Sequence, residues 1–361
     1  MKIIVSAGGT GGHLYPALAL VEYIQSRNPD TEFLFVGTTD RIESRIVPEK
    51  GYNYVGLHVK GMVGNPIQKA KNALIFLKSL SHSKKIIRNF DPDVIIGFGG
   101  YPSASIVLAG QQLHKKTMIH EQNSVIGLTN KILVKKVDKI IACYEKAYNE
   151  FPKEKTYLLG NPRASVIAQS ELKDVHDLYH IEKDRKVLVI VMGSLGSSSV
   201  NNVMMEALKQ LDLKDTDVLF TTGNQDYERI KSQMQDVSEN IHVLPYIDDM
   251  PSVLSTSTLV VSRGGATTLA EITSIGAASV IIPSPYVVAN HQEYNARELS
   301  DKKAAYLLLE KDLTAEHFVS VVSELLNDPD KINELKTNAK LLGKPDACKD
   351  IYEQMVKLIN E

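Results

Sequence analysis

Short apolar runs alternate with longer stretches of helical periodicity along the whole chain. Runs of strand character occupy residues 3–7, 32–37, 94–98, 117–120, 139–143 and 156–159, and a second series occupies residues 187–192, 217–221, 241–244, 259–262, 280–283 and 305–309. Strands that alternate with helices predict a parallel sheet with helices on both faces. The two series therefore predict an α/β chain of two Rossmann-like, doubly wound parallel-sheet domains that face a cleft.

Both series open with a buried strand that ends in a glycine turn and enters a helix. The first turn reads Gly-Gly-Thr-Gly-Gly-His over residues 8–13, and the second reads Gly-Ser-Leu-Gly over residues 193–196. Ligands of such sheets bind outside the carboxyl ends of the strands. We place the first domain at residues 1–163 and the second at 164–345. A last helix is expected at 346–359, and its periodicity does not choose between packing back on the first domain and packing on the second.

Composition narrows the class of protein. The 361 residues are 43% apolar and 23% charged, which is the usage of a folded globular chain. Aromatic residues make up only 6% and Trp is absent, so no stacking platform for single-stranded nucleic acid is expected. Cys143 and Cys348 do not suffice for a disulfide framework or a cysteine-rich zinc site, which is typical of a reducing cytosol. No apolar run approaches the about 18 to 20 residues that span a bilayer.

Charge is distributed unevenly. Residues 1–163 contain 22 Lys and Arg against 13 Asp and Glu, whereas the remainder contains 19 against 30. Residues 60–88 belong to a longer stretch, 50–90, that holds eight basic side chains and no acid, with a helical pattern over 67–80. A solvated basic face is the plain interpretation of such a run. A more specific interpretation is that this stretch contacts anionic lipid headgroups. Binding of nucleic acid is disfavoured because the whole chain is slightly acidic.

The turn at residues 8–13 is the first candidate site. Its glycines let the backbone approach phosphate oxygens, and the helix that follows places a partial positive charge there. It is not a P-loop, because no Gly-Lys-Ser/Thr follows, and Leu14 stands where a dinucleotide fingerprint needs its third glycine. His13 lies at the helix start, where the dipole favours the neutral ring, so it is a candidate general base. A tight turn without a ligand and a structural histidine are the alternatives.

Other polar segments follow later strands. Gly97-Phe98-Gly99-Gly100-Tyr101-Pro102-Ser103 allows a second close approach of backbone to phosphate, and His120-Glu121-Gln122-Asn123 is expected to line the edge of the cleft. Asp91-Pro92-Asp93 is interpreted as a turn rather than a metal site.

In the second half, residues 262–272 run from a strand through two glycines and two threonines into a helix. This pattern predicts an anion site, and the carboxylate of Glu271 suits a sugar diol. Together these features indicate the diphosphate and ribose of a nucleotide, with an ordinary capped helix as the alternative. The segment at 290–297 adds amide side chains, among them Gln292, that suit the hydroxyl and amide groups of a sugar.

The motifs together resemble those of the MurG family, in that family's order and over nearly the whole chain. They are Gly-Gly-Thr-Gly-Gly-His at 8–13, Gly-Gly-Tyr at 99–101, His-Glu-Gln-Asn at 120–123, Gly-Leu-Thr-Asn-Lys at 127–131, Gly-Asn-Pro-Arg at 160–163, Gly-Ser at 193–194, Ile-Asp-Asp-Met at 247–250 and Arg-Gly-Gly-Ala at 263–266 with Glu271. Two departures occur: Arg163 directly follows Pro162 where many members have one more residue, and Met192 replaces a usual glycine.

The resemblance implies a GT-B fold and a function. Members of the family move N-acetylglucosamine from UDP-N-acetylglucosamine (UDP-GlcNAc) with inversion to the C4 hydroxyl of lipid I, a muramyl-peptide pyrophosphoryl polyprenol, and so form lipid II. Donor contacts are implied at Thr10, Gly11, Gly12, Asn123, Arg163, Ser194, Ile247, Ala266, Thr267, Thr268, Leu269, Ala270, Glu271 and Gln292. Among these, Ile247 would contact uracil through its backbone, Glu271 the ribose and Gln292 the sugar.

The residue chemistry suits this assignment. An in-line displacement needs a base, for which His13 is the candidate, and positive potential for the departing UDP, which helix N-termini and Arg163 can supply without a metal or other cofactor. Because a polyprenol acceptor stays in the bilayer, the basic stretch at 60–88 becomes a membrane-facing patch. The expected place is the cytoplasmic side of the cell membrane, as a peripheral protein of peptidoglycan synthesis, cell shape and division.

Two other functions remain open from the sequence. A UDP-sugar epimerase of the same architecture would need no lipid and would favour more acids and histidines in the cleft. A non-enzymatic sensor of nucleotide sugars would share the donor loops and lack the base.

Overall fold

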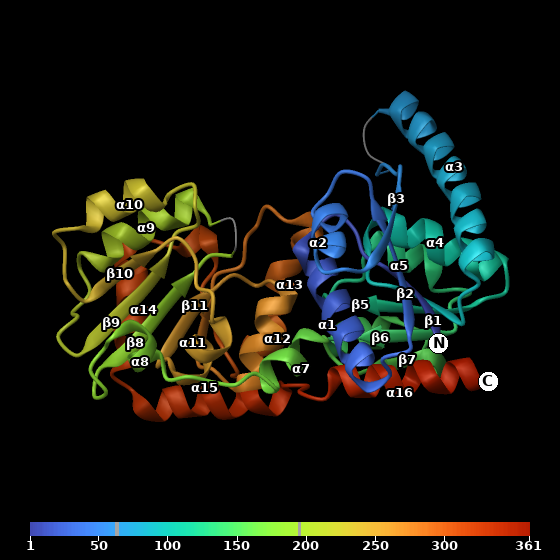
Figure 1. The fold of residues 1–361 in the computed structure, drawn as a ribbon. Helices are drawn as coiled ribbons and strands as arrows, with labels where there is room; N and C mark the ends of the chain where they lie inside the picture. Colours follow the sequence, from blue (N-terminus) through green and yellow to red (C-terminus); the bar gives the residue numbers. More distant parts are fainter. Residues whose placement is uncertain (62–64, 194–195) are drawn as a thin grey trace. The chain divides into compact units, whose positions relative to one another are not determined.

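The structure is a computed structural model that describes residues 1–61, 65–193 and 196–361, without the side chains of residues 66 and 69. The chain forms two compact units, one of Met1–Ser165 with Asp346–Glu361 and the other of Val166–Pro345. Each unit is a parallel sheet between layers of helices (Figure 1). Among the described residues, no helix combines the length and the apolar character needed to cross a membrane.

The sheet of the first unit has the order β3-β2-β1-β4-β5-β6-β7. Its strands are β1 (Lys2–Ser6), β2 (Glu32–Thr38), β3 (Asn53–Leu57), β4 (Val94–Gly97), β5 (Lys116–Glu121), β6 (Lys139–Ala142) and β7 (Thr156–Leu158). Its helices are α1 (Gly11–Arg27), α2 (Glu43–Glu49), α3 (Pro66–Phe90), α4 (Gly100–Gln112), α5 (Leu128–Leu133), α6 (Glu145–Glu150), the short η1 (Lys153–Lys155) and the C-terminal α16 (Ala347–Asn360). The crossover from β2 through β1 to β4 makes the sheet doubly wound, so the turn after β1 lies where the strand order reverses.

Helix α16 belongs to the core of the first unit, although it ends the chain (Figure 1, red). Cys348, Ile351, Met355 and Leu358 are buried in the same cluster as Leu14 of α1. Four apolar side chains at this spacing form one face of a helix, and their burial holds α16 against the first sheet layer.

The second unit repeats the plan, with the sheet order β10-β9-β8-β11-β12-β13. Its strands are β8 (Lys186–Val191), β9 (Thr216–Thr221), β10 (Ile241–Leu244), β11 (Leu259–Ser262), β12 (Ser279–Ile281) and β13 (Tyr306–Leu307). Its helices are α8 (Val175–Tyr179), α9 (Ser198–Leu208), α10 (Tyr227–Met234), α11 (Met250–Thr256), α12 (Ala266–Ile275), η2 (Val288–Asn290), α13 (His291–Ser300), η3 (Glu310–Asp312), α14 (Ala315–Leu326) and α15 (Pro329–Leu342). Helix α7 (Arg163–Ala168) joins the two units in sequence.

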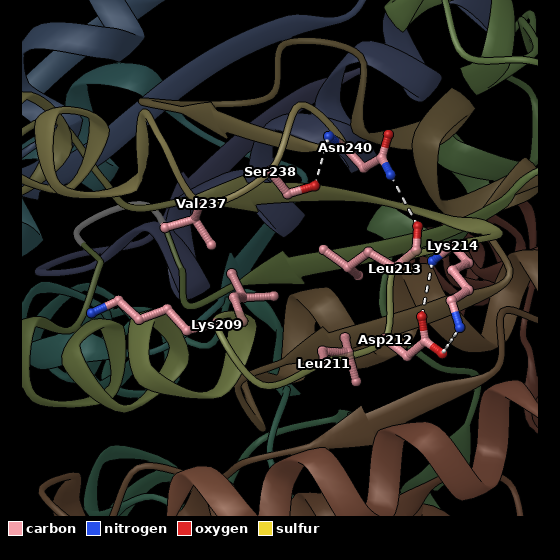
Figure 2. Close-up of a pocket in the computed structure, with 9 residues that line it drawn as sticks. Lys209, Leu211, Asp212, Leu213, Lys214, Val237, Ser238 and Asn240 are labelled. Atoms are coloured by element: carbon pink, nitrogen blue, oxygen red, sulfur yellow. Dashed lines mark hydrogen bonds and ion pairs between the residues drawn. The ribbon is translucent and has the colours of Figure 1, made fainter.

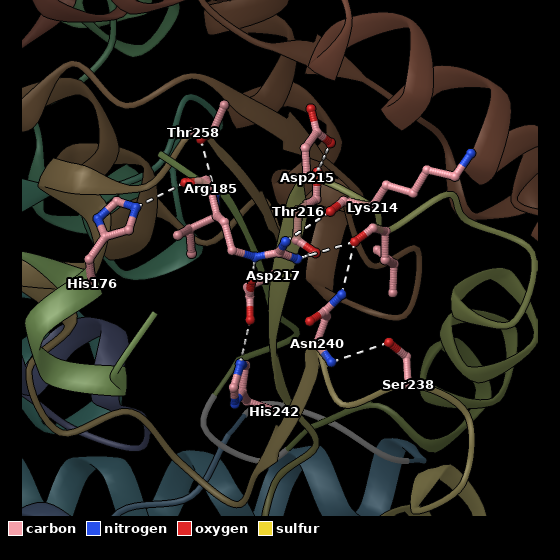
Figure 3. A network of polar contacts seen from close by, with 12 residues as sticks. His176, Arg185, Lys214, Asp215, Thr216, Asp217, Ser238, Asn240, His242 and Thr258 are labelled. Carbon is pink, nitrogen blue, oxygen red and sulfur yellow. Dashed lines mark hydrogen bonds and ion pairs between the residues drawn. The ribbon is translucent and has the colours of Figure 1, made fainter. Parts of the chain in front are cut away.

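A polar network fixes the amino ends of the strands in the second unit (Figure 3). The guanidinium of Arg185 binds the carboxylate of Asp217 and donates to the carbonyl of Lys214 at 2.8 Å, and Asp217 also contacts His242 Nε2 at 2.8 Å. The carbonyl of Arg185 accepts from His176 Nε2 at 2.9 Å. This network joins α8, β8, β9 and β10, and it lies at the end of the sheet opposite to the glycine turns.

The predicted strands overlap those of the structure, with one omission. Strand β3 pairs with β2 at the edge of the first sheet and was not predicted. It contains an exposed Asn53, a half-buried Tyr54 and Gly56, so it lacks the continuous apolar run that marks the buried strands.

Candidate active site

His13 lies in the first turn of α1, directly after the glycine turn that ends β1. Its Nδ1 is 2.8 Å from the carbonyl oxygen of Gly8 and 3.4 Å from Thr10 Oγ1. A carbonyl oxygen only accepts hydrogen bonds, so this geometry assigns the ring hydrogen to Nδ1 and the lone pair to Nε2. Thr10 and Gly12 are exposed, while Gly11 and His13 are half-buried. The site therefore holds an imidazole in the tautomer that can take up a proton at Nε2.

The second glycine loop lies against this turn. Gly99 and Gly100 have φ angles of 111° and 82°, which favour glycine. A Cβ added at Gly99 would lie 2.8 Å from His13 Nε2, and one added at Gly100 would lie 2.5 Å from the carbonyl oxygen of Gly8. The two loops thus approach each other more closely than side chains would allow, and His13 packs against the backbone of Gly99.

His120 lies fully buried behind the second loop. Its ring packs against Phe98 with centroids 5.0 Å apart, and its Nε2 is 3.2 Å from the carbonyl oxygen of Gly160. Burial lowers the pKa of His120 to about 4 against the raising effect of the Gly160 hydrogen bond, and nearby His13 lowers it further. His120 is consequently a neutral support at neutral pH.

The expectation that residues 120–123 line the site with four polar side chains is wrong for three of them. Glu121 is buried because its carboxylate accepts the backbone N–H of Asn123 at 3.1 Å and that of Gly127 at 2.8 Å. Burial is also the main reason that the pKa of Glu121 is raised. Gln122 is buried and donates to the carbonyl of Phe98. Asn123 is the half-buried member.

The remaining site residues of the first unit share its carboxyl edge. Asn123 follows β5 and Arg163 follows β7, while Thr10, Gly11, Gly12 and His13 follow β1. Arg163 is half-buried at the start of α7, where its N–H donates to Asn161 Oδ1 at 3.0 Å. Asn161 thereby fixes the backbone from which the guanidinium extends.

The second unit places the predicted donor segment at the start of α12. Ala266, Thr267, Thr268 and Ala270 are half-buried in its first turns, and Glu271 is 8% exposed. The Oγ1 atom of Thr267 is buried without a hydrogen-bond partner among the described residues. Leu269 and Ile247 are 0% and 1% exposed, so neither presents its side chain at the surface. The N-terminus of α12 offers its amide groups and positive dipole end to an anion.

Gln292 braces the loop that follows β12. Its Oε1 accepts the N–H of Ser284 at 2.9 Å, and a Cβ at Gly264 would lie 2.4 Å from the carbonyl oxygen of Gln292. Arg263 is 9% exposed and donates to Glu310 at 2.5 Å and to Ser197 at 2.8 Å, so this guanidinium holds the fold together. Ser194 lies outside the described residues.

A surface cavity of about 330 Å³ lies elsewhere in the second unit (Figure 2). It is lined by Leu208, Lys209, Leu211, Asp212, Leu213, Lys214, Val237, Ser238 and Asn240. These residues precede β9 and β10, so the cavity lies at the amino ends of the strands and is separate from the candidate site. Across the described ranges, no group of three or more His, Cys, Asp and Glu side chains is placed to hold a metal ion.

Sequence comparisons bear on both halves of the chain. Residues 3–142 match the glycosyltransferase family 28 N-terminal domain, and residues 187–351 match the glycosyltransferase family 28 C-terminal domain. A protein of Bacillus cereus named UDP-N-acetylglucosamine--N-acetylmuramyl-(pentapeptide) pyrophosphoryl-undecaprenol N-acetylglucosamine transferase 1 is 43% identical, with 100% of both chains covered. A transferase of the same name, without the number, from Listeria welshimeri is 40% identical over 99% of this chain and 100% of its own.

This chain belongs to the MurG family of glycosyltransferases. The crystal structure of MurG from Acinetobacter baumannii has a TM-score of 0.82 and 26% identity, with 99% of each chain covered. The fold is therefore GT-B, and the chain is a hexosyltransferase. A putative UDP-N-acetylglucosamine 2-epimerase from Listeria monocytogenes has a TM-score of 0.73 at 13% identity, with 98% of this chain and 95% of that one covered, which reflects the shared fold alone.

Two structural contacts were not predicted from the sequence, although Arg263 belongs to the motif at 263–266. Glu43 is 1% exposed and binds the glycine turn, and Arg263 is bound to Glu310. The sequence shows an acid at 43 and a base at 263, and nothing in their spacing to these partners marks the contacts.

Proposed function

We propose that this MurG-family enzyme transfers N-acetylglucosamine from UDP-GlcNAc to the C4 hydroxyl of lipid I and so produces lipid II. The observation that carries the proposal is the 43% identity, over the full length of both chains, to a transferase named for this donor sugar and this acceptor. A role in peptidoglycan synthesis follows, and through it a role in cell shape and division.

The chemistry is a single displacement with inversion at C1 of the sugar. His13 Nε2 takes the proton of the acceptor hydroxyl, the hydroxyl oxygen forms a bond to C1, and the bond from C1 to the phosphate oxygen breaks with its electron pair leaving on UDP. The Nδ1 contact to Gly8 at 2.8 Å supports this role because it leaves the lone pair on Nε2. The glycine loops and Arg163 supply hydrogen-bond donors and positive potential for pyrophosphate groups.

The second unit is proposed to hold most of the donor. The N-terminus of α12, with Ala266, Thr267, Thr268, Leu269 and Ala270, would bind the diphosphate, while Glu271 would accept hydrogen bonds from the ribose. Ile247 would meet uracil through its backbone, and Gln292 would contact the sugar. Thr10, Gly11, Gly12, Asn123 and Ser194 complete the proposed set. The buried Glu271 and the Thr267 Oγ1 atom, which has no hydrogen-bond partner among the described residues, support this placement.

The membrane is the proposed location of the acceptor, with the enzyme bound peripherally on its cytoplasmic side. On α3, Ile67, Leu74 and Leu77 are 81%, 62% and 59% exposed. Lys71 and Lys78 are exposed on the same helix, and the spacing 67, 71, 74, 78 places apolar and basic side chains on one face. Such a face suits the boundary between acyl chains and anionic headgroups. Lys69 belongs to the same basic stretch, and its side chain lies outside the described residues.

The test is a product assay. Purified enzyme is incubated with isotopically labelled UDP-GlcNAc and a lipid I analogue, and the products are separated and weighed by mass spectrometry. We expect the acceptor to gain one N-acetylglucosamine residue and UDP to appear in equal amount. Conversion of UDP-GlcNAc to another UDP-sugar without an acceptor would indicate the epimerase instead, and binding without turnover would indicate a sensor.

A further inference from the structure

A buried carboxylate lies beneath the catalytic glycine turn. Glu43 is the first residue of α2 and is 1% exposed. Its Oε1 accepts the N–H of Thr38 at 3.0 Å and the Thr38 hydroxyl at 2.8 Å. Both of its carboxylate oxygens lie 3.2 Å from the N–H of Gly9. All of these partners are donors, which is the environment that an ionised, acceptor-only carboxylate requires.

One peptide group connects this carboxylate to His13. The carbonyl of Gly8 and the N–H of Gly9 belong to the same planar amide, whose two ends share one π system. Glu43 accepts from the N–H end at 3.2 Å, and the carbonyl end accepts from His13 Nδ1 at 2.8 Å. Hydrogen bonds in such a series polarise one another, so a carboxylate at the N–H end makes the carbonyl a stronger acceptor.

We propose that Glu43 is a positioning residue that acts on His13 through the Gly8–Gly9 peptide. It holds the imidazole in the Nδ1–H tautomer and makes Nε2 more basic. In hydrolytic triads a carboxylate is hydrogen-bonded directly to Nδ1 of the histidine. Here the carboxylate acts in the same way through the intervening Gly8–Gly9 peptide. The proposal rests on the assignment of His13 as the base, and it adds the group that sets the state of that base.

The backbone conformation of the turn favours the contact between the Gly8–Gly9 peptide and Glu43. Gly9 has a φ angle of 90°, which orients its N–H toward Glu43 without a Cβ penalty. A Cβ at Gly8 would lie 2.4 Å from Pro102 Cγ and 3.3 Å from Glu43 Oε1. The peptide is therefore packed between the second glycine loop and the carboxylate, and it has no room to turn over.

The neighbouring titratable groups leave Glu43 as the source of charge. His120, which faces His13 from β5, stays neutral because its burial lowers its pKa to about 4. Tyr54 of β3 donates to the carbonyl of Thr38, and burial, then Glu43 and Asp40, raise its pKa, so it stays neutral as well. Asp40 is exposed to solvent, which screens its charge.

The test compares Glu43→Gln with Glu49→Gln. Both changes remove one carboxylate from α2, but Glu49 is exposed at the far end of the helix. Glutamine at 43 keeps an oxygen for the Thr38 donors and loses the charge. We expect kcat to fall about tenfold in Glu43→Gln, as for other groups that orient a functional histidine, with the KM for UDP-GlcNAc changed less than about twofold. The acidic limb of the kcat profile moves to lower pH because the imidazolium form loses stabilisation. Glu49→Gln should match the wild type, and a Glu43→Gln enzyme that does the same overturns the proposal.

A spectroscopic readout separates this inference from the proposed function. Nitrogen chemical shifts of ¹⁵N-labelled histidine report the tautomer of His13, with His13→Ala used to assign its signals. The wild type is expected to show the Nδ1–H form, and Glu43→Gln a mixture of both tautomers. The wild-type reading does not depend on the folding of Glu43→Gln, and an Nε2–H form in the wild type contradicts the proposal outright. If His13→Ala retains turnover, the base assignment fails, while the two spectra still decide whether Glu43 sets the tautomer.

Discussion

The two units share a fold and differ in what they place at the carboxyl ends of their strands. Both sheets have their first strand in the middle and reverse their order there, so both offer a glycine turn at the same topological position. In the first unit that turn leads into His13, the proposed base, whose Nδ1 lies 2.8 Å from the carbonyl oxygen of Gly8. In the second unit the buried polar groups lie one strand further, where α12 presents Thr267 and Glu271.

Charge follows the same division. Residues 1–163 carry 22 basic against 13 acidic side chains, and the rest of the chain carries 19 against 30. The basic excess of the first unit would suit the proposed acceptor at an anionic membrane. In the second unit, the helix dipole of α12 rather than net charge would attract the proposed nucleotide. A common framework thus places different residues at the carboxyl ends of its strands.

Replacing His13, the proposed base, should give the largest difference between the roles of the two units. In His13→Ala we expect turnover to fall about 100- to 10,000-fold, the range for loss of a general base, while UDP-GlcNAc still binds through the second unit. Initial rates and isothermal titration calorimetry measure the two effects. Turnover at the wild-type rate would remove His13 from the mechanism.

Replacing exposed lysines of α3 with neutral residues tests whether the basic charge of the first unit attracts the membrane. Each lysine near an anionic surface contributes about 1 kcal/mol, so Lys71→Gln with Lys78→Gln should weaken binding to phosphatidylglycerol vesicles about 30-fold. Vesicle cosedimentation at fixed salt gives the measurement. Lys209→Gln with Lys214→Gln makes the same change in net charge on the second unit and should have little effect. Equal losses in the two double variants would mean that net charge, and not the α3 face, attracts the membrane.

The contact between the two glycine loops can be tested with a pair of glycines. Gly99→Ala strains a φ of 111° and places a Cβ 2.8 Å from His13 Nε2, whereas Gly51→Ala strains a φ of 84° with nothing within 4 Å. Both should lose about 1 kcal/mol or more of stability. Only Gly99→Ala should also lower kcat, by about tenfold, because it displaces the base. Thermal melts and steady-state rates distinguish the effects, and a similar fall in kcat in both variants would argue against the loop contact.

The smallest expected effect is a pH-dependent loss of stability when His176 of the second unit is replaced. His176 has Nδ1 2.7 Å from Asp174 and Nε2 2.9 Å from the carbonyl of Arg185, so both ring nitrogens face acceptors. Burial opposes the charged ring, but these hydrogen bonds raise the pKa of His176 overall. A raised pKa in the folded state contributes stability below the unfolded value of about 6.5 and loses it as the pH rises through the folded value.

His176→Gln should therefore destabilise the protein more at pH 5.5 than at pH 8.5, by about 0.5 to 1 kcal/mol. Urea unfolding at the two pH values measures this difference. His82→Gln, an exposed histidine on α3, is the control. A loss of stability that is equal at both pH values would show that His176 acts through packing alone.

The sequence predicted the elements that depend on local pattern. Buried strands such as β1 and β8 are continuous apolar runs, and the glycine turns that follow them are visible as residues. Contacts between distant segments were not predictable in this way. Glu43 reaches a turn 34 residues away, and the Sγ of Cys348 in α16 contacts the carbonyl of Ala19, 329 residues away.

Polar residues after a strand were also misleading. His120, Glu121 and Gln122 suggested an open edge, but each finds a backbone partner inside the protein and is buried. A polar side chain is buried where the fold satisfies its hydrogen bonds, and the local sequence does not show whether it will.

A crystal structure with UDP-GlcNAc tests the division of labour between the units most directly. The account predicts density for uridine beside Glu271, with its diphosphate at the N-terminus of α12. Uridine bound against Gly8–Gly12 instead, with the space beside Glu271 empty, would contradict it.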